Sequence, residues 1–215
     1  MHGVRASRVD MLDRARFLSR AGYAVLLFDF QAHGESAGNQ ITFGYLESKD
    51  ARAAVMFAHT IAPDKKVGVI GVSMGGAAVL LADPPLSVDA AVLEQVYPTL
   101  RDAIGDRISM RFGAWSEALT PLLSWQLRPR LGISNQALRP VDHVEKMPGP
   151  KLFVGGAADQ NTTESEVRNM FQVANSPKEL WIIPGAEHVD LCRFGKAEYQ
   201  DRILDFFARY LLTSR

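Results

Sequence analysis

The sequence predicts an α/β fold, because short apolar runs alternate with segments of helical periodicity along most of the chain. Runs of this length are typical of strands buried in a mostly parallel sheet with helices on both faces. With 215 residues, of which 47% are hydrophobic and 22% charged, the chain has the composition of one globular domain. The expected strands cover residues 23–30, 66–71, 89–94, 151–156 and 179–185.

Helices are expected on both sides of these strands. Ser7 and Asp10 form the pattern of a capping box, and Gly22 follows the helix that they would begin. Residues 44–61 and 163–174 repeat the helical pattern. The chain ends in an amphipathic helix that carries Tyr199, Ile203, Phe206 and Tyr210.

The alternation of strands and helices breaks over residues 97–147. This segment has the pattern of two short helices and contains no expected strand. We therefore expect a single domain over residues 1–215 that is interrupted by an inserted helical cap over residues 97–147.

Charge and cysteine content argue against several classes of function. Lys and Arg number 24, as do Asp and Glu, so there is no basic block for nucleic acid to bind. The single cysteine, Cys192, and the five histidines show no spacing typical of metal ligands. The first residues are charged, and no run is long enough to cross a bilayer. If Met1 is the true start, a soluble cytoplasmic protein is expected.

A serine, Ser73, lies in a glycine-rich segment between an expected strand and an expected helix. Gly71, Val72, Ser73, Met74 and Gly75 form the pattern G-x-S-x-G at this junction, which is the context of a nucleophile elbow. Such a turn strains the serine backbone, and side chains in place of the two glycines would collide with the neighbouring strand and helix. The Ser73 hydroxyl is then expected at the carboxyl end of the sheet, where the Met74 N–H can donate to an oxyanion.

Two other interpretations of this pattern are open. A dinucleotide-binding loop would need a glycine where Ser73 stands, because the backbone must approach the pyrophosphate there. A structural turn with an incidental serine fits the pentapeptide alone, but the flanking strand and helix favour a nucleophile.

A nucleophilic serine needs a base and a third group that orients the base. In the chain order serine, acid, histidine, these partners are expected just beyond the ends of later strands. Asp159 follows the strand expected at 151–156, and His188 follows the last expected strand. We therefore predict that Asp159 and His188 complete a catalytic triad with Ser73.

The acid and the base each have alternatives. Asp159 would otherwise cap the following helix, although Thr162 or Thr163 serves that purpose better. Glu94, at the end of the preceding expected strand, is the reserve acid. Two histidines are weaker candidates for the base: His59, within an expected helix, and His143, at the exit from the cap.

With Ser73, Asp159 and His188 in this order, the chain resembles the α/β-hydrolase-fold serine hydrolases, and among them the bacterial esterases and lysophospholipase-like proteins. The resemblance runs nearly from end to end. It implies that the opening MHGVR contains the family's H-G, whose loop supplies the second oxyanion N–H, here at Val4.

A second loop carries the same resemblance. The stretch FDFQAHGES matches the family's D-x-x-x-H-G-x-S loop after the fourth strand. The resemblance implies that His33 and Ser36 shape this loop and take no part in catalysis.

The chain departs from the family at its front. In the family, the strand that runs into the H-G lies between those that correspond to residues 23–30 and 66–71, and this strand is missing here. Its loss would leave interior N–H and C=O groups unpaired or force the two remaining strands to pair directly. We expect that Met1 is an internal start or that the chain is a truncated relative, and that the Val4 N–H is held less firmly.

The triad and the resemblance together imply transfer of an acyl group to Ser73 and then to water, without a cofactor. Trp115, Trp125 and Phe112 are candidate substrate-binding residues that either wall an acyl pocket or pack the cap onto the sheet. An apolar wall favours a small-molecule carboxylic ester. A peptidase or thioesterase on the same triad is the nearest alternative. A non-catalytic pseudo-hydrolase that acts as a binding protein is the alternative from another class.

Overall fold

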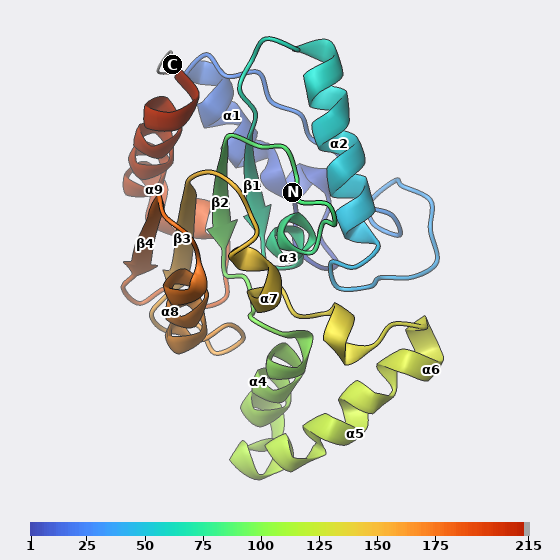
Figure 1. Cartoon of the computed structure of the whole chain (residues 1–215). Coiled ribbons are helices and arrows are strands. Elements are labelled where there is room, and N and C mark those ends of the chain that lie inside the picture. Colours follow the sequence, from blue (N-terminus) through green and yellow to red (C-terminus); the bar gives the residue numbers. More distant parts are fainter. Residues whose placement is uncertain (213–215) are drawn as a thin grey trace.

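A four-stranded parallel sheet lies at the centre of the molecule. The computed structural model describes residues 1–212, without the side chains of residues 114 and 117. The carboxyl ends of the strands point toward the same edge of the sheet (Figure 1). Four of the five expected strands are confirmed within a few residues. In sheet order they are β1 (Gly68–Val72), β2 (Ala90–Glu94), β3 (Lys151–Gly156) and β4 (Lys178–Ile183).

Helices cover both faces of the sheet (Figure 1). On one face lie α1 (Leu12–Arg20) and α9 (Leu191–Phe207), with η1 (Arg8–Met11) before α1 and η4 (Ala208–Leu212) after α9. On the other face lie α2 (Glu47–Ile61), α3 (Met74–Leu80) and α8 (Glu164–Val173). Alternate strand residues enter the two cores, as the period of two requires. Ile70, Val92 and Val154 lie in the first core, and Val69, Leu93 and Phe153 in the second.

The predicted helix starts are confirmed. Ser7 and Asp10 make the expected capping box, which begins η1 and leads directly into α1. Thr163 caps α8 and forms a second capping box with Glu166. Among residues 1–212, no helix is long and apolar enough to span a membrane.

The segment between β2 and β3 is helical, as expected, but it contains more helices than the two predicted. It forms an arm beyond the carboxyl ends of the strands (Figure 1). In chain order the helices are α4 (Leu100–Phe112), η2 (Ala114–Leu119), α5 (Thr120–Trp125), α6 (Leu127–Leu131), η3 (Asn135–Ala137) and α7 (Val141–Val144).

The strand predicted over residues 23–30 is wrong, because no part of this segment pairs as a strand in the described structure. Val25 is 38% exposed and Leu26 is 41% exposed, whereas residues of an interior strand would be buried. An apolar run becomes a strand only when another strand offers it hydrogen bonds, and β1 does not run beside this segment. An open hollow of about 440 Å³ lies here, lined by Ala15, Arg16, Ser19, Arg20, Tyr23, Ala24 and Val25.

The first residues lie between β1 and the extended segment 23–30. The Met1 amino group donates to Ile70 O (2.8 Å), and Val72 N donates to Met1 O (3.1 Å). These are the two hydrogen bonds of a parallel bridge, so Met1 pairs with β1 for one residue. On the other side, Phe30 N donates to His2 Nε2 (3.1 Å). Of the two outcomes expected for a missing strand, direct pairing of its neighbours does not occur.

A buried ion pair joins helices on one face of the sheet to the central strand β2. The guanidinium of Arg14, on α1, donates to Glu94 Oε2 at the end of β2 (2.7 Å). The Tyr199 hydroxyl, on α9, also donates to the Glu94 carboxylate. Arg14 further contacts Asp190 Oδ1 at 2.9 Å. The Glu94 side chain is completely buried, so its charge depends on these partners.

We predict that Arg14→Met lowers the free energy of unfolding by about 3–5 kcal/mol, because Glu94 then keeps a buried charge without its cation. Denaturant unfolding of the purified variants measures this. Arg16→Met is the matched control on the same helix, since Arg16 pairs with Asp13 at the surface and its side chain is 62% exposed. The control is expected to change stability by about 0.5 kcal/mol or less. Equal stability of the two variants would contradict the prediction.

Two carboxyl groups meet where the cap joins the core. Asp106 on α4 hydrogen-bonds Glu166 on α8, while Thr163 N donates to Glu166 Oε2 (2.7 Å). Burial, together with the nearby charge of Asp106, raises the pKa of Glu166 to about 7 from 4.5, against the lowering effect of Thr163. The folded protein therefore holds this proton more tightly than the unfolded chain, and stability falls as the pH rises from 4.5 to 7.

We predict that Glu166→Gln stabilises the protein at pH 8, because an amide stays neutral and can donate to Asp106. The expected gain is about 1–2 kcal/mol after allowance for partial solvent exposure, and it vanishes toward pH 4.5. Denaturant unfolding at several pH values measures the difference from wild type. Glu164→Gln, in the same helical turn, is the control, because Glu164 pairs with Arg168 near the surface. A gain that is the same at every pH would refute the explanation.

Candidate active site

Ser73 lies at the turn between β1 and α3. β1 ends at Val72 and α3 begins at Met74, so Ser73 alone makes the junction. Its backbone angles are φ 49° and ψ −114°, a strained conformation for a residue with a side chain. Its N–H donates to Glu94 O on the neighbouring strand (2.8 Å). The strained elbow predicted from the glycine pattern is therefore present in the structure.

The two glycines of the pattern are needed because backbone atoms approach them closely. A Cβ on Gly71 would lie 2.6 Å from Gly76 Cα in α3. A Cβ on Gly75 would lie 2.6 Å from the carbonyl oxygens of Met1 and His2. Both distances are far below van der Waals contact, so this turn and the first residues of the chain pack together only with glycine at these positions.

The structure brings both predicted oxyanion donors to the neighbourhood of Ser73. Met74 is the first residue of α3, so its N–H has no acceptor within the helix and lies at the positive end of the helix dipole. A Cβ on Gly3 would lie 3.7 Å from Ser73 Cβ, so the half-buried Val4 follows a residue that lies close to the serine. The donor role of these two N–H groups remains a prediction.

Asp159 and His188 form a hydrogen-bonded pair at the same edge of the sheet. His188 Nδ1 lies 2.8 Å from Asp159 Oδ2. The other carboxylate oxygen, Oδ1, accepts from Asn161 N (2.8 Å) and Thr162 N (3.0 Å). Burial alone would raise the pKa of Asp159, but His188 and these backbone donors outweigh it and lower the pKa below its usual value. Asp159 is therefore an anion that can orient an imidazole.

Ser73 and His188 are not joined directly. Among the hydrogen bonds of residues 1–212, none links Ser73 Oγ to His188. The His188 side chain is 22% exposed, whereas that of Asp159 is buried. Hydrogen bonds to a catalytic base are often long without substrate and shorten in the substrate complex. The Asp159–His188 pair is thus formed before substrate binds, and the link to Ser73 is the part of the predicted triad that the structure leaves open.

The alternative roles for the acidic residues do not fit the structure. Thr163 caps α8, so Asp159 is not needed as the cap. The carboxylate of Glu94 is engaged by Arg14 and Tyr199 on the α1 and α9 face of the sheet. Glu94 is therefore a structural residue and is not available to His188.

Gln95 also belongs to this site, although no sequence motif predicts it. Its Nε2 donates to Asp159 Oδ2 (2.8 Å) and to Glu187 O (2.9 Å). Gln95 is buried, has a positive φ of 50°, and directly follows β2. A polar residue just beyond the end of a strand, at the edge that carries the other candidates, was the signal that would have found it.

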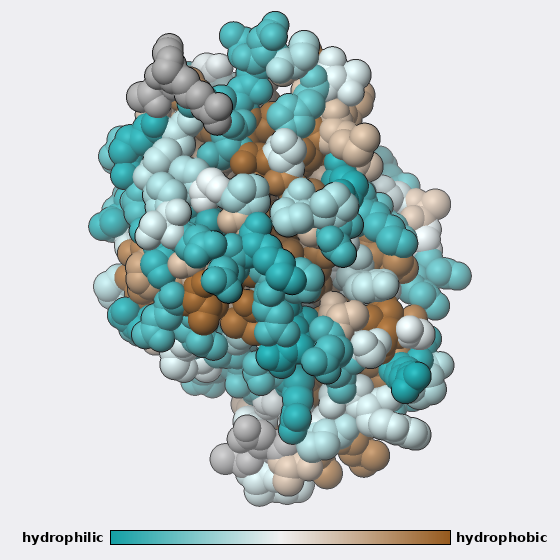
Figure 2. All heavy atoms as spheres, in the orientation of Figure 1, coloured by the Kyte–Doolittle hydropathy of each residue, from teal (hydrophilic) through white to brown (hydrophobic). Residues whose placement is uncertain are grey.

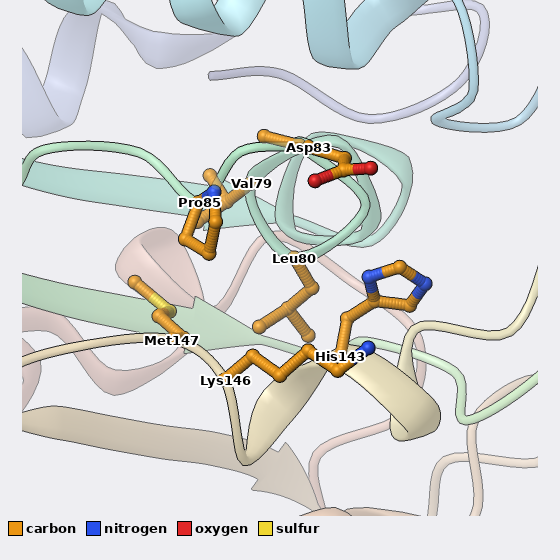
Figure 3. Close-up of a pocket in the computed structure, with 8 residues that line it drawn as sticks. Val79, Leu80, Asp83, Pro85, His143, Lys146 and Met147 are labelled. Atoms are coloured by element: carbon orange, nitrogen blue, oxygen red, sulfur yellow. The ribbon is translucent and has the colours of Figure 1, made fainter.

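The two alternative candidates for the base, His59 and His143, lie away from Ser73. His59 Nε2, on α2, is 2.8 Å from Ser87 O. His143, on α7, lines a small cavity of about 70 Å³ with Lys146, Asp83 and Leu80 (Figure 3). This cavity lies beside the C-terminal end of α3, whereas Ser73 precedes its N-terminal end, so it is not the substrate site.

The loop that resembles D-x-x-x-H-G-x-S makes local contacts. His33 Nδ1 is 2.8 Å from Gln31 O, and Ser36 Oγ donates to Asp29 O (2.8 Å). Both side chains therefore hold their own loop, as the resemblance implies. Within residues 1–212, no group of three or more His, Cys, Asp or Glu side chains is placed to hold a metal ion.

The three candidate substrate-binding residues lie on the cap and are largely exposed. Trp115 is 71% exposed, Trp125 is 67% exposed and Phe112 is 58% exposed. Apolar atoms are visible on the surface of the cap, at the bottom of the view in Figure 2. Residues that pack the cap onto the sheet would be buried, so this exposure argues against a packing role for the three residues. Their role in binding substrate remains a prediction.

Comparison with known proteins assigns the fold to a family. A model of the alpha/beta hydrolase family matches residues 1–198. The uncharacterized protein YqkD of Bacillus subtilis (strain 168) is 22% identical over 209 residues, which cover 95% of this chain and 68% of that protein. The alpha/beta hydrolase domain-containing protein WAV2 of Arabidopsis thaliana is 25% identical over 206 residues, covering 89% of this chain and 62% of the relative. The chain thus spans about two thirds of the length of these relatives.

Solved structures agree with this assignment. The Pyrococcus furiosus esterase Pf2001 has a TM-score of 0.78 at 26% identity, covering 98% of this chain and 80% of the esterase. The alpha/beta hydrolase GrgF from Penicillium sp. sh18 has a TM-score of 0.72 at 24% identity and covers 98% of this chain and 88% of GrgF, a likeness of fold alone. The parallel sheet flanked by helices and the match of the family model to nearly the whole sequence lead to one conclusion: this chain belongs to the alpha/beta hydrolase family.

Proposed function

We propose that the protein is a serine hydrolase that cleaves carboxylic esters through an acyl-enzyme on Ser73. The observation that carries the proposal is the hydrogen bond between His188 and Asp159, at the sheet edge where the strained turn presents Ser73. An oriented imidazole beside a strained serine is the arrangement that activates a hydroxyl for acyl transfer.

In the proposed reaction, Ser73 Oγ attacks the ester carbonyl carbon while His188 Nε2 takes the hydroxyl proton. Asp159 keeps the proton of His188 on Nδ1 and stabilises the imidazolium that forms. The N–H groups of Met74 and Val4 donate to the oxyanion of the tetrahedral intermediate. The intermediate collapses when His188 gives its proton to the leaving alcohol. Water then attacks the acyl-enzyme with His188 as the base, and Ser73 is released with the carboxylic acid.

Two observations bear on the substrate: the first favours an apolar acyl group, which an ester and a thioester share, and the second favours an ester. Trp115, Trp125 and Phe112 give the cap an exposed apolar surface beyond the catalytic edge of the sheet, which suits an acyl chain. The similar structure from Pyrococcus furiosus is an esterase. A small-molecule ester is therefore the proposed substrate. A peptide or a thioester is the alternative on the same triad, and a panel of the three substrate types separates them.

We predict that a fluorophosphonate forms a single covalent adduct on the purified protein, because the reagent reacts with an activated serine. Intact mass measures the adduct, and Ser73→Ala is expected to abolish it. Ser36→Ala, which changes another loop serine, is expected to keep it. A folded wild-type protein without an adduct would overturn the proposed function and favour a non-catalytic binding protein.

We also predict that Asp159→Asn leaves the protein folded but slows turnover of an aryl ester by about 10³–10⁴-fold, because the amide favours the wrong tautomer of His188. Steady-state kinetics measure kcat, and circular dichroism checks the fold. Asp142→Asn is the control, since Asp142 pairs with Arg139 near the surface of the cap. Turnover by Asp159→Asn at the rate of the control would show that Asp159 is not the acid of the triad.

A further inference from the structure

The side-chain amide of Gln95 bridges both partners of the proposed triad. Its Nε2 lies 2.8 Å from Asp159 Oδ2, the same oxygen that His188 Nδ1 contacts at 2.8 Å. It also lies 2.9 Å from the carbonyl oxygen of Glu187, the residue before His188. We propose that Gln95 is a positioning residue that holds the Asp159 carboxylate and the backbone of His188 in the geometry required for proton transfer. This inference rests on the proposed function.

The donor capacity of the amide matches its two acceptors. An amide NH₂ has two N–H groups, and Gln95 directs them to one carboxylate oxygen and one main-chain oxygen. Gln95 is 1% exposed and its contact with Asp159 is buried, so water does not substitute for that contact. A donor to Asp159 Oδ2 limits rotation of the carboxylate, because this oxygen then sits between Gln95 and His188.

The backbone fixes Gln95 relative to the nucleophile. Gln95 N donates to Val154 O on β3 (2.8 Å), and the preceding residue, Glu94, accepts from Ser73 N through its main-chain oxygen (2.8 Å). The positive φ of Gln95 turns the chain out of β2 at this point. A non-glycine residue with positive φ is strained, and such strain persists where the surroundings hold the residue in place.

Other contacts do not replace the bridge. Asn161 N and Thr162 N donate to Oδ1 of Asp159, the oxygen that does not face His188. Gln95 is therefore the protein donor, besides His188, that restrains Oδ2 among the described residues. Its loss is expected to leave an ionised Asp159 whose Oδ2 is less firmly aimed at the imidazole.

The first test compares Gln95→Met with wild type. Methionine has a similar length and cannot donate, so both contacts are lost with little change in volume. We expect kcat for an aryl ester to fall by about 10- to 100-fold, as for other small misplacements of a catalytic group, with KM changed by about twofold or less. Tyr97→Phe is the matched control, because it removes a buried hydrogen bond two residues away, from Tyr97 to Phe43 O (2.6 Å).

The second variant, Gln95→Glu, adds a readout that a purely structural role would not change. The introduced carboxyl donates to Asp159 only when it is protonated, and the proximity of Asp159 favours the protonated form. As the pH rises, this carboxyl ionises and repels Asp159. The activity of Gln95→Glu relative to wild type is therefore expected to fall with pH, whereas the loss in Gln95→Met stays constant.

The Nδ1–H proton between His188 and Asp159 gives a measurement that needs no substrate. Its low-field NMR resonance is expected to shift or broaden in Gln95→Met and to stay unchanged in Tyr97→Phe. An unchanged resonance in Gln95→Met, or kcat within twofold of wild type, would overturn the inference. So would an equal loss in both Gln95 variants at every pH. If wild-type protein gives no fluorophosphonate adduct, the proposed function fails, and the resonance still decides the role of Gln95.

Discussion

The end of strand β2 is the point on which both the fold and the candidate site depend. The main-chain oxygen of Glu94 accepts from Ser73 N, and its carboxylate holds Arg14 and Tyr199 from the helices on one face. The next residue, Gln95, reaches Asp159 on the neighbouring strand's loop. Because β2 lies between β1 and β3, its last residue, Glu94, and the residue after it, Gln95, connect the nucleophile with the acid. Arg14 and Tyr199 satisfy the buried carboxylate of Glu94, so its charge is paired and hydrogen-bonded there.

Four of the strands and the catalytic candidates were predictable from the sequence because their signals are local. A short apolar run bounded by glycine or proline identifies β3, and a serine between glycines identifies the elbow at Ser73. Asp159 and His188 follow from their places just beyond strand ends. Arg14 and Glu94 are 80 positions apart in the sequence, and Gln95 and Asp159 are 64 positions apart. No local sequence pattern predicts contacts between residues so far apart.

The segment 23–30 shows where local signals fail. Its composition is that of a buried strand, yet strand formation depends on a partner, and β1 offers hydrogen bonds on that side to Met1 alone among the described residues. The number of helices in the cap was missed for a related reason. Short helices such as α5 and α6 depend on packing against their neighbours more than on a periodic pattern of apolar residues. The sequence therefore predicts that the segment is helical but does not predict how many helices it forms.

Several contacts hold residues 1–3, which lead into the loop that carries Val4. Met1 N donates to Ile70 O (2.8 Å), and Val72 N donates to Met1 O (3.1 Å). His2 accepts from Phe30 N, and the Met1 and His2 carbonyl oxygens press against Gly75. Three separate parts of the chain thus fix residues 1–3 beside Ser73. Packing around Gly75 and pairing with β1 therefore both hold the residues that precede Val4.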